Sequence, residues 1–413
     1  MIDLRRLADD EAYRAGAVRK GANADAVGQL LDLESRRRSS QSTTEELRAR
    51  QNAASKEIGR AAPEDRPARI EEAGRLKDEL ATAEDELRTL ADEVRELALT
   101  IPNPAHESVP DGGEDDAIMV HEVGEQTEAP PRDHAEYAEA MGFIDLARGA
   151  RTSGSRFAYL LREAALVELA LVQYAMRTVV EAGFVPVVPP TLVTEDMMVD
   201  AGFFPTDRNQ VYELERDALH LVGTAEVPLA GIHRQERLAA DELPLRYAGF
   251  SSCFRREAGT YGKDTRGIFR VHQFDKVEMF SYVAPDDSWD ELERLRELQE
   301  TIIGGLGLPY RVVNIAAGDL GAAAAKKYDL EAWLPSEGRY REITSCSNYL
   351  DFSARRLDCR VAGAGFAHTL NGTACAISRT LVFLFEHGQQ ADGSWVVPEV
   401  LRPWTGFDVV EPR

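Results

Sequence analysis

The sequence predicts an α+β protein, in which an antiparallel helical coiled-coil hairpin precedes a domain built on an antiparallel sheet flanked by helices. Two observations carry this prediction. Within the first hundred residues, apolar positions recur in alternating steps of four and three, which is the spacing of a coiled-coil seam. After about residue 150, strand-like runs follow one another at irregular spacings, without the regular strand–helix alternation of a parallel sheet.

The composition is that of a globular protein. The chain has 413 residues, with 48 Lys and Arg against 71 Asp and Glu, a net charge of −23, and 44% of its residues are hydrophobic. This excludes collagen-like and wholly disordered chains. The acidic excess argues against a nonspecific nucleic-acid binder, although a locally basic surface can still hold a particular RNA. Four cysteines without a CxxC pair predict neither a disulfide framework nor a structural zinc site.

The sequence also predicts the cellular location of the protein. No apolar run approaches the ~18–20 residues that a membrane helix needs, and residues 1–6 lack the apolar core of a signal peptide. We therefore expect a cytoplasmic protein without a membrane partner.

Two helical stretches on either side of a turn predict the hairpin. In residues 70–101 the seam consists of Leu76, Leu80, Ala83, Leu87, Leu90, Val94, Leu97 and Ile101. A weaker seam in residues 27–58 consists of Leu30, Leu33, Leu47, Ala54 and Ile58. Residues 59–67, with two prolines, are typical of a turn. Two helices of about 30 residues, or ~45 Å, must therefore fold back on each other.

The function of the hairpin is left open by its residues. A coiled coil of this kind can be a dimerisation rod or a spacer. The first helix is rich in cations, with Arg36, Arg37 and Arg38 followed by Arg48 and Arg50. Such a face can lie along a phosphate backbone or simply be solvated.

The rest of the chain divides into a linker and a second domain. Residues 104–135 are rich in proline and acid, which predicts a connector that buries little apolar surface. We therefore expect domains at 1–103 and 136–413, joined by 104–135. In the second domain, the expected helices are residues 156–182, ending before Gly183, and residues 287–304. The expected extended or strand segments are 184–190, 219–222, 269–274, 276–282 and 310–314.

One segment of the second domain places charged residues where a structural strand would have apolar ones. It runs from Cys253 through a glycine-bearing loop to Glu278. Arg255 can neutralise a phosphate or carboxylate with its planar fork, and Phe274 offers a stacking face for a base. Lys263 and Arg266 in the loop can reach further phosphates or an RNA end. The alternative is a merely charged sheet face.

Two further clusters favour a nucleotide site over that alternative. Glu342 and Thr344 fall on one face of a predicted strand, with Ser345 at its end, and their oxygens suit a magnesium ion that carries phosphates. In residues 370–379, small residues open an apolar helix and Arg379 lies at its start, where a rigid element fixes it. Together the clusters predict a site for a triphosphate.

These segments resemble the bacterial seryl-tRNA synthetases of class II over essentially the whole chain. The long helix with Gly183 to Pro190 resembles motif 1, Phe254 to Phe274 resembles motif 2, and Gly372 to Arg379 resembles motif 3. Serine-specific fragments of the family match at 223–229, 270–278, 342–348 and 368–373. Agreement of several unrelated stretches in the right order is far more specific than any single motif, and the class I signatures HIGH and KMSKS are absent.

The resemblance implies an α+β class II catalytic domain and a homodimer. It further implies that the enzyme activates L-serine with ATP and Mg²⁺ and transfers it to a serine tRNA, whose long variable arm the hairpin reaches. A selenocysteine tRNA is a further candidate acceptor.

The resemblance also assigns residues to roles. The catalytic residues would be Arg255 and Arg379. Serine would be bound by Thr224, Ala225, Glu226, Arg255, Glu278, Asn371 and Thr373. ATP would be bound by Arg255, Arg256, Glu257, Val271, Phe274, Glu342, Ile343, Thr344, Ser345 and Arg379. Magnesium would be held by Glu342 and Ser345.

Within these sets the family pattern gives individual tasks. Thr224 and Glu226 would hold the serine ammonium, and Glu278 with Thr373 would receive its hydroxyl. Arg255 would bridge the serine carboxylate and the α-phosphate.

At the nucleotide, Glu257 would bind the adenine amino group, Phe274 would stack under the ring, and Arg379 would meet the γ-phosphate. The nucleophile is an ionised carboxylate, so no general base is required.

Two other readings compete with a serine–tRNA ligase. A paralogue can form seryl-adenylate or seryl-tRNA for a biosynthetic or self-resistance role, or deliver serine to a carrier protein. The carrier-loading relatives lack the long arm that this chain keeps. A non-catalytic scaffold would have lost the charged site residues, which are present here.

Overall fold

The computed structural model describes residues 1–412 apart from 260, 261, 263 and 265. Lys263, which was expected to reach phosphates, therefore lies outside the described residues. The chain divides into two compact units, Met1–Pro104 and Ala105–Arg413.

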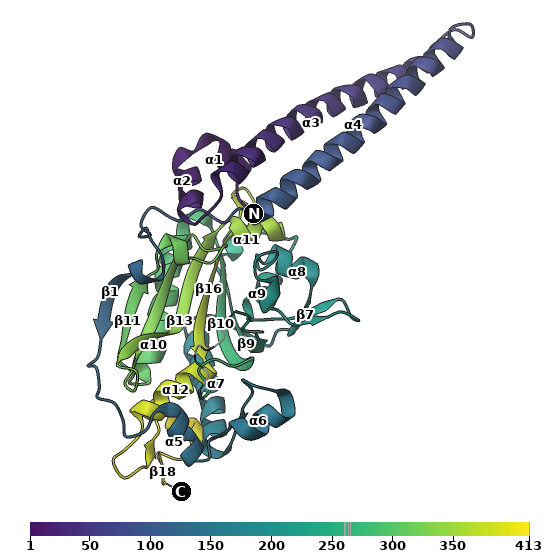
Figure 1. Cartoon of the computed structure of the whole chain (residues 1–413). Helices are drawn as coiled ribbons and strands as arrows, with labels where there is room; N and C mark the ends of the chain where they lie inside the picture. The colour runs from purple at the N-terminus through teal and green to yellow at the C-terminus, as the bar shows by residue number, and fades with distance from the viewer. Residues whose placement is uncertain (260–261, 263, 265, 413) are drawn as a thin grey trace. The chain divides into compact units, whose positions relative to one another are not determined.

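The first unit is helical. Its helices are α1 (Leu4–Asp9), α2 (Glu11–Arg19), α3 (Ala24–Ile58) and α4 (Arg66–Thr100). Helices α3 and α4 lie side by side along their length and form the predicted hairpin (Figure 1). The side chain of Asn23 caps α3, and Pro67 falls in the first turn of α4, where its missing N–H costs nothing.

Burial follows the predicted seam. Each seam residue of α4, from Leu76 to Ile101, is buried or half-buried. On α3 the seam is interrupted by two polar residues: Glu34 is buried and pairs with Arg37 and Arg38 of its own helix, and Thr44 contacts α4. An apolar cluster of buried residues lies at the base of the hairpin, where Leu30 and Val94 join residues of α1 and α2. The seam of α3 is weak because these polar groups replace apolar ones.

The second unit is organised by one large sheet. Over the described residues this sheet has eight strands in the order β1-β11-β12-β13-β16-β10-β9-β4, and all neighbours are antiparallel except β4 and β9 (Figure 1). In that order the strands are Ile118–Val123, Tyr310–Asn314, Lys326–Leu334, Arg339–Leu350, His368–Ala376, Gln273–Val283, Leu245–Phe254 and Val185–Val187. The predicted α+β class with an antiparallel sheet is confirmed.

Helices cover this sheet and minor strands border it. The helices are α5 (His134–Ala140), α6 (Leu146–Ser153), α7 (Arg162–Glu181), α8 (Glu195–Asp200), α9 (Glu226–Ala230), α10 (Ser288–Gly305), α11 (Phe352–Leu357), α12 (Ile377–His387) and α13 (Arg402–Thr405). The short strands are β2 (Ile144–Asp145), β3 (Tyr159–Leu160), β5 (Leu192–Thr194), β6 (Glu213–Leu214), β7 (Leu219–Leu221), β8 (Arg237–Leu238), β14 (Arg360–Val361), β15 (Gly365–Phe366), β17 (Trp395–Val396) and β18 (Val409–Val410).

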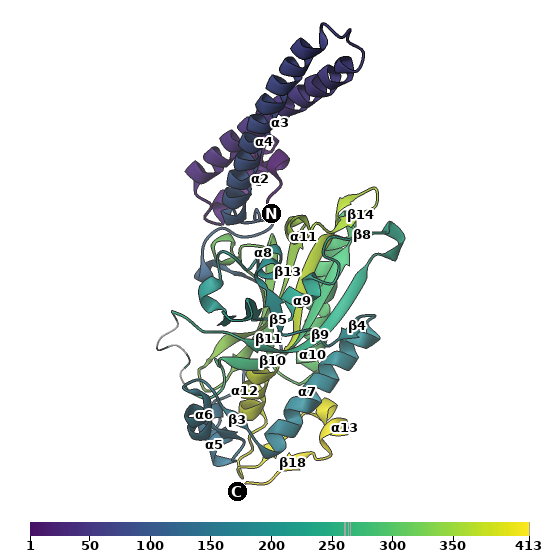
Figure 2. The ribbon, with the colours of Figure 1, turned by 90° about the vertical axis from the view of Figure 1, so that its right-hand side faces the viewer.

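The two faces of the sheet have different partners. Helices α7, α10 and α12 share the main core with one face, and Figure 2 shows α7 running beside β9 and β4. On β10, Val277 and Met279 belong to this core, whereas Phe280 and Tyr282 belong to a second cluster with α8, α9 and α11. Because side chains alternate along a strand, the even-numbered residues from Lys276 to Tyr282 of β10 face away from the helical core.

Three sequence expectations differ from the structure. The helix expected from residue 156 begins at Arg162, because Tyr159 and Leu160 pair with β2 as β3. The strand expected over 269–274 begins only at Gln273. Upstream of it, Arg270 bonds Glu257 and Asp264 across the loop instead of joining the sheet. In the expected connector, Ala105 and Val109 are buried and β1 pairs with β11, although the apolar side chains of β1 are exposed.

The remaining general expectations concern membranes and cysteines. None of the described helices is both long and apolar enough to cross a membrane. The four cysteines are buried free thiols.

Candidate active site

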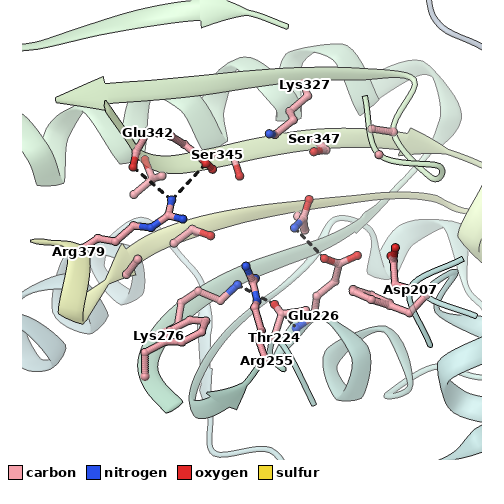
Figure 3. Close-up of a pocket in the computed structure, with 18 of the residues that line it drawn as sticks. Asp207, Thr224, Glu226, Arg255, Lys276, Lys327, Glu342, Ser345, Ser347 and Arg379 are labelled. Carbon is pink, nitrogen blue, oxygen red and sulfur yellow. Dashed lines mark hydrogen bonds and ion pairs between the residues drawn. The ribbon is translucent and has the colours of Figure 1, made fainter. Parts of the chain in front are cut away.

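A cleft of about 310 Å³ opens on the sheet face away from the helical core (Figure 3). Strands β10, β13 and β16 form its floor, and further lining comes from the segment before α9, the residues after β9, β12, the start of α12 and the segments 201–207 and 321–324. The predicted residues that line it are Thr224, Glu226, Arg255, Glu257, Val271, Phe274, Glu342, Ile343, Thr344, Ser345, Asn371, Thr373 and Arg379. The structure therefore gathers all three sequence clusters into one place.

A few predicted residues lie outside this lining. Ala225 is fully buried beneath it. Glu278 is also fully buried and reaches the cleft through its bonds to Thr224, Asn371 and Thr373. Arg256 has an exposed side chain beyond the lining.

Arg266 lies outside the lining too. It forms surface ion pairs with Asp133 and Glu136 instead of pointing into the cleft.

At one end of the cleft, two buried carboxylates share an amide. Asn371 donates from Nδ2 to Glu226 Oε2 and to Glu278 Oε1, at 3.0 Å each. Thr373 donates to the other oxygen of Glu278 at 3.3 Å. Burial and the charge of Glu278 raise the pKa of Glu226 to about 7. The arrangement offers hydrogen-bond acceptors to a small cationic or hydroxylated ligand.

Arg255 is held at the centre of the cleft by its backbone position and two contacts. It directly follows β9, and its Nε donates to the Gly223 carbonyl at 3.1 Å. Its guanidinium lies 5.2 Å from the ring centroid of Phe274. The Gly223 bond uses one of five N–H donors and leaves the terminal nitrogens for ligands.

At the other end of the cleft, Glu342 and Arg379 form an ion pair. Arg379 Nη1 lies 3.1 Å from Glu342 Oε2 and also donates to the Glu342 carbonyl (Figure 3). Burial opposes ionisation of Glu342, but Arg379 and Lys327 lower its pKa to about 2. Glu342 is therefore a carboxylate throughout the physiological range.

A β-bulge sets which residues of β13 face the cleft. Opposite β12 the register shifts between Glu342 and Thr344, so Ile343 is the extra residue, and its side chain enters the main core. Glu342 and Ser345 both line the cleft although they are three residues apart. The expectation that Ser345 ends the strand was wrong, because β13 continues to Leu350 in pairing with β12 and β16.

The donors at this end fit a magnesium ion. Glu342 offers an ionised carboxylate and Ser345 a hydroxyl, and both are hard oxygen ligands of the kind Mg²⁺ prefers.

Charge pairs tie the described residues after β9 to one another and to β13. Arg270 Nη1 lies 2.6 Å from Glu257 Oε2, and Arg341 binds Asp264 at 2.8 Å. Glu257 has a positive φ of 52°, an uncommon conformation for a residue with a side chain. The carboxylate expected to read adenine is thus held by an arginine of the same loop.

Sequence reasoning missed several residues of the cleft. Lys276 lies on β10 two positions before Glu278, so strand alternation would have placed the two on one face. Lys327 on β12 pairs with Asp329 at 2.9 Å and lies near Glu342. Asp207, Tyr349 and the segment 321–324 also line the cleft, and no pattern in the sequence pointed to them.

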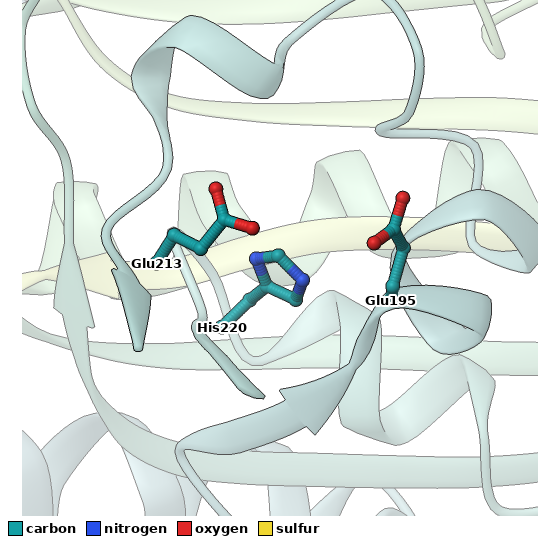
Figure 4. A group of neighbouring side chains, drawn as sticks. All are labelled: Glu195, Glu213 and His220. Atoms are coloured by element: carbon teal, nitrogen blue, oxygen red, sulfur yellow. The ribbon is translucent and has the colours of Figure 1, made fainter. Parts of the chain in front are cut away.

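A second cluster of potential metal ligands lies elsewhere. Glu195 at the start of α8, Glu213 on β6 and His220 on β7 come together, with ligand atoms within 4.8 Å of one another (Figure 4). Arg208 forms ion pairs with both glutamates. A resident cation therefore already pairs with both carboxylates, and we assign no metal to them.

Comparison with known proteins identifies two family models in the chain. Residues 1–105 match the seryl-tRNA synthetase N-terminal domain, and residues 210–388 match the tRNA synthetase class II core domain (G, H, P, S and T).

Similar curated proteins cover the whole chain. The serine–tRNA ligase 1 of Streptomyces avermitilis and the serine–tRNA ligase of Thermobifida fusca are each 49% identical, over 100% of this chain and 99% of theirs.

Solved structures agree with this. The seryl-tRNA synthetase of Pyrococcus horikoshii, complexed with ATP, has a TM-score of 0.94 at 37% identity and full coverage of both chains. The cytoplasmic serine–tRNA ligase of Naegleria fowleri, in complex with AMP, has a TM-score of 0.90 at 30% identity, over 100% of this chain and 99% of that one.

Proposed function

Because the chain belongs to the class II seryl-tRNA synthetases, which are serine–tRNA ligases, we propose that the cleft is where it joins serine to ATP before a tRNA receives the seryl group. The chain is thus an aminoacyl-tRNA synthetase with ATP as a substrate. One observation carries the placement: three separate sequence clusters meet in one cleft, with carboxylates at one end and an arginine–glutamate pair at the other. The relatives' names favour this activity over the paralogue reading.

Serine is proposed to bind at the carboxylate end. Glu226 and Thr224 would take its ammonium, and Glu278 with Thr373 its hydroxyl. The Oε2 of Glu278 already accepts from the Thr373 hydroxyl, so a ligand hydroxyl can join an existing polar cluster. Ala225 and Asn371 would complete the serine subsite, Asn371 by holding both carboxylates in place.

The nucleotide is proposed to occupy the remainder of the cleft. Phe274 and Val271 would flank the adenine, Glu257 and Arg256 would lie at its edge, and Ile343 and Thr344 would border the phosphates. Arg379 would meet the γ-phosphate, after exchanging its present partner Glu342 for that anion.

Mg²⁺ is proposed to bind between Glu342 and Ser345. When bound, it would neutralise phosphate charge. Because Glu342 is ionised at neutral pH, it can exchange its partner Arg379 for the ion without first losing a proton.

The first chemical step needs charge neutralisation more than proton transfer. The serine carboxylate attacks the α-phosphorus, the bond from that phosphorus to the bridging α–β oxygen breaks, and pyrophosphate leaves; the attacking group and the phosphate are both anionic. Arg255 is fixed at the centre of the cleft by Gly223, so its terminal nitrogens can face both anions without reorganising. The attacking carboxylate is already ionised, so no described residue is assigned as a base.

The first unit is proposed to bind tRNA. Arg36, Arg50, Lys56 and Arg60 on the hairpin are exposed and, among the described residues, have no ion-pair partner, whereas Arg48 pairs with Glu84 of α4. Unpaired cations can exchange their counterions for RNA phosphates. We assign residues 1–103 to tRNA binding, 104–135 to a connector and 136–413 to catalysis. The acceptor is a serine tRNA, with a selenocysteine tRNA as a second candidate.

A homodimer in the cytoplasm is proposed as the working form. Strand β4 ends the large sheet, and the exposed fractions of Val188 just after it and of Leu169 on the adjacent α7 are 85% and 61%. Leu166 lies one turn from Leu169 and is also exposed. An apolar helix face beside a sheet edge is typical of a surface buried by a second copy.

The amino-acid choice tests this proposal. ATP–pyrophosphate exchange is measured with each amino acid, and serine tRNA is then charged with those that react. We expect serine to support exchange, and we expect kcat/KM for alanine to be lower by ~10⁴–10⁵. Alanine has no hydroxyl, so the Glu278 carboxylate and the Thr373 hydroxyl would be left without their hydrogen-bonding ligand. Comparable rates with serine and alanine would refute the assignment of the hydroxyl subsite.

A further inference from the structure

A lysine that the proposed roles leave without a task lies at the base of the serine subsite. Lys276 is 6% exposed, and its Nζ lies 2.5 Å from Glu278 Oε2. The same Nζ lies 2.7 Å from Thr224 Oγ1 (Figure 3). It lines the cleft, so it is not simply a partner within the apolar core. A buried ammonium needs such partners because water no longer solvates it.

Only one of the two buried carboxylates near Lys276 has a cation as its partner among the residues that the structure describes. Glu278 has Lys276 as its cation, whereas among the described residues no cation lies within ion-pair distance of the Glu226 carboxylate. Instead, Glu226 accepts from the amide of Asn371, whose own oxygen accepts from the hydroxyl of Tyr349. Within the described part of the chain, the subsite thus holds two carboxylates but only one ion pair, although the charge of Arg255 also acts on Glu226.

We propose that Lys276 is a positioning residue that reserves Glu278 for the substrate hydroxyl and leaves Glu226 as the carboxylate that receives the substrate ammonium. This inference rests on the proposed serine subsite. Two equivalent buried carboxylates would otherwise compete for one ammonium, and serine would be held in more than one orientation. With Lys276 in place, only the Glu226 end attracts a cation, so the serine hydroxyl is directed to Glu278.

The same geometry explains the electrostatics of the two carboxylates, Glu226 and Glu278. Other titratable groups that face the two carboxylates are Arg255, Cys253 and Tyr349. Burial and Glu278 raise the pKa of Glu226 to about 7, while Lys276 and Arg255 act to lower it. Without the lysine charge, one influence that lowers the pKa of Glu226 would be lost, and that pKa would rise further.

The test is Lys276→Met, measured by ATP–pyrophosphate exchange from pH 6 to pH 9. We expect the pH dependence of the KM for serine to shift upward by about 1–3 units, the effect of removing one close opposite charge. We also expect the ratio of kcat/KM for serine to that for alanine to fall at least about tenfold, since the hydroxyl is no longer directed to Glu278. A lysine with only a structural role would move neither the profile nor the ratio.

A double-mutant cycle with Glu278→Gln keeps the test decisive if the single variant folds poorly. Lys276→Met/Glu278→Gln leaves no unpaired charge at the pair. If Lys276 acts through Glu278, adding Lys276→Met to Glu278→Gln changes the serine-to-alanine ratio by less than threefold. An equal loss in both backgrounds would overturn the proposal, as would a folded Lys276→Met variant with the parent's pH profile.

The parent protein separates this inference from the proposed function. If the parent shows no serine-dependent exchange, the proposed serine subsite fails. If the parent is active with serine and the variants do not behave as expected, only the role of Lys276 fails.

Discussion

Replacing Arg255 with lysine should remove most of the activity while leaving the fold intact. The arginine Nε donates to the Gly223 carbonyl at 3.1 Å, so its four other N–H donors, on two terminal nitrogens, remain for the serine carboxylate and the α-phosphate. A lysine ammonium has three donors on a single nitrogen. It cannot keep the Gly223 bond and also present a planar fork to two anions.

The expected loss is ~10²–10³ in kcat/KM, about 3–4 kcal/mol, as for one preorganised charge contact at a reacting centre. Serine-dependent ATP–pyrophosphate exchange measures it, and tRNA charging should fall equally because adenylate formation comes first. Among the described residues, the side chain of Arg255 makes one hydrogen bond within the protein, to the Gly223 carbonyl. Losing it should lower the melting temperature by no more than about 2–4 °C.

The matched control is Arg237→Lys, which changes an exposed arginine of β8 that lies outside the cleft lining. It should retain the parent's exchange rate. The reasoning is refuted if Arg255→Lys keeps exchange within about threefold of the parent, well short of one lost charge contact. Unfolding of the variant would instead make the arginine structural, and the placement of the α-phosphate would be wrong.

Three further predictions address the serine subsite, the hairpin and the dimer. Because Glu226 has a pKa of about 7 and must be ionised to hold an ammonium, the KM for serine should rise about tenfold from pH 8 to pH 6; Glu226→Gln should flatten that rise, and a profile unchanged in this variant would contradict the role. Replacing residues 39–88 with a short Gly-Ser loop keeps the apolar cluster at the base of the hairpin. ATP–pyrophosphate exchange should then persist while tRNA charging falls sharply. Equal tRNA charging by the shortened and the full-length protein would make the hairpin a spacer. Leu169→Glu/Val188→Glu should give monomers by sedimentation, because two charges would be buried in the proposed interface; an unchanged dimer would place the interface elsewhere.

Much of the fold was predictable because it follows from local periodicity. The four–three spacing of Leu76 to Ile101 predicted one arm of the hairpin, and each of these residues is buried or half-buried. The runs 276–282 and 310–314 fall within β10 and β11. Periodicity failed at 269–274, where Arg270 bonds to loop carboxylates and the chain joins the sheet only at Gln273.

The candidate site was predictable as a set of residue types, and the cleft indeed gathers most of them. What the sequence could not predict is how those residues are paired. Arg379 with Glu342 and Arg270 with Glu257 bring together residues 37 and 13 positions apart. The bulge at Ile343, which puts Glu342 and Ser345 into the same cleft, depends on the register with β12.

The sequence by itself therefore determined the helical hairpin, the main strands and the chemical character of the site, because side-chain periodicity and residue type are properties of the chain alone. Only the tertiary structure decided which strands became neighbours, and so which charges meet. Lys276 shows the reason. Lys276 and the nearby Glu278 can both be read from the sequence, but the second contact of Lys276, Thr224, lies 52 positions away. That contact exists only once β10 and the segment before α9 enclose the same buried space.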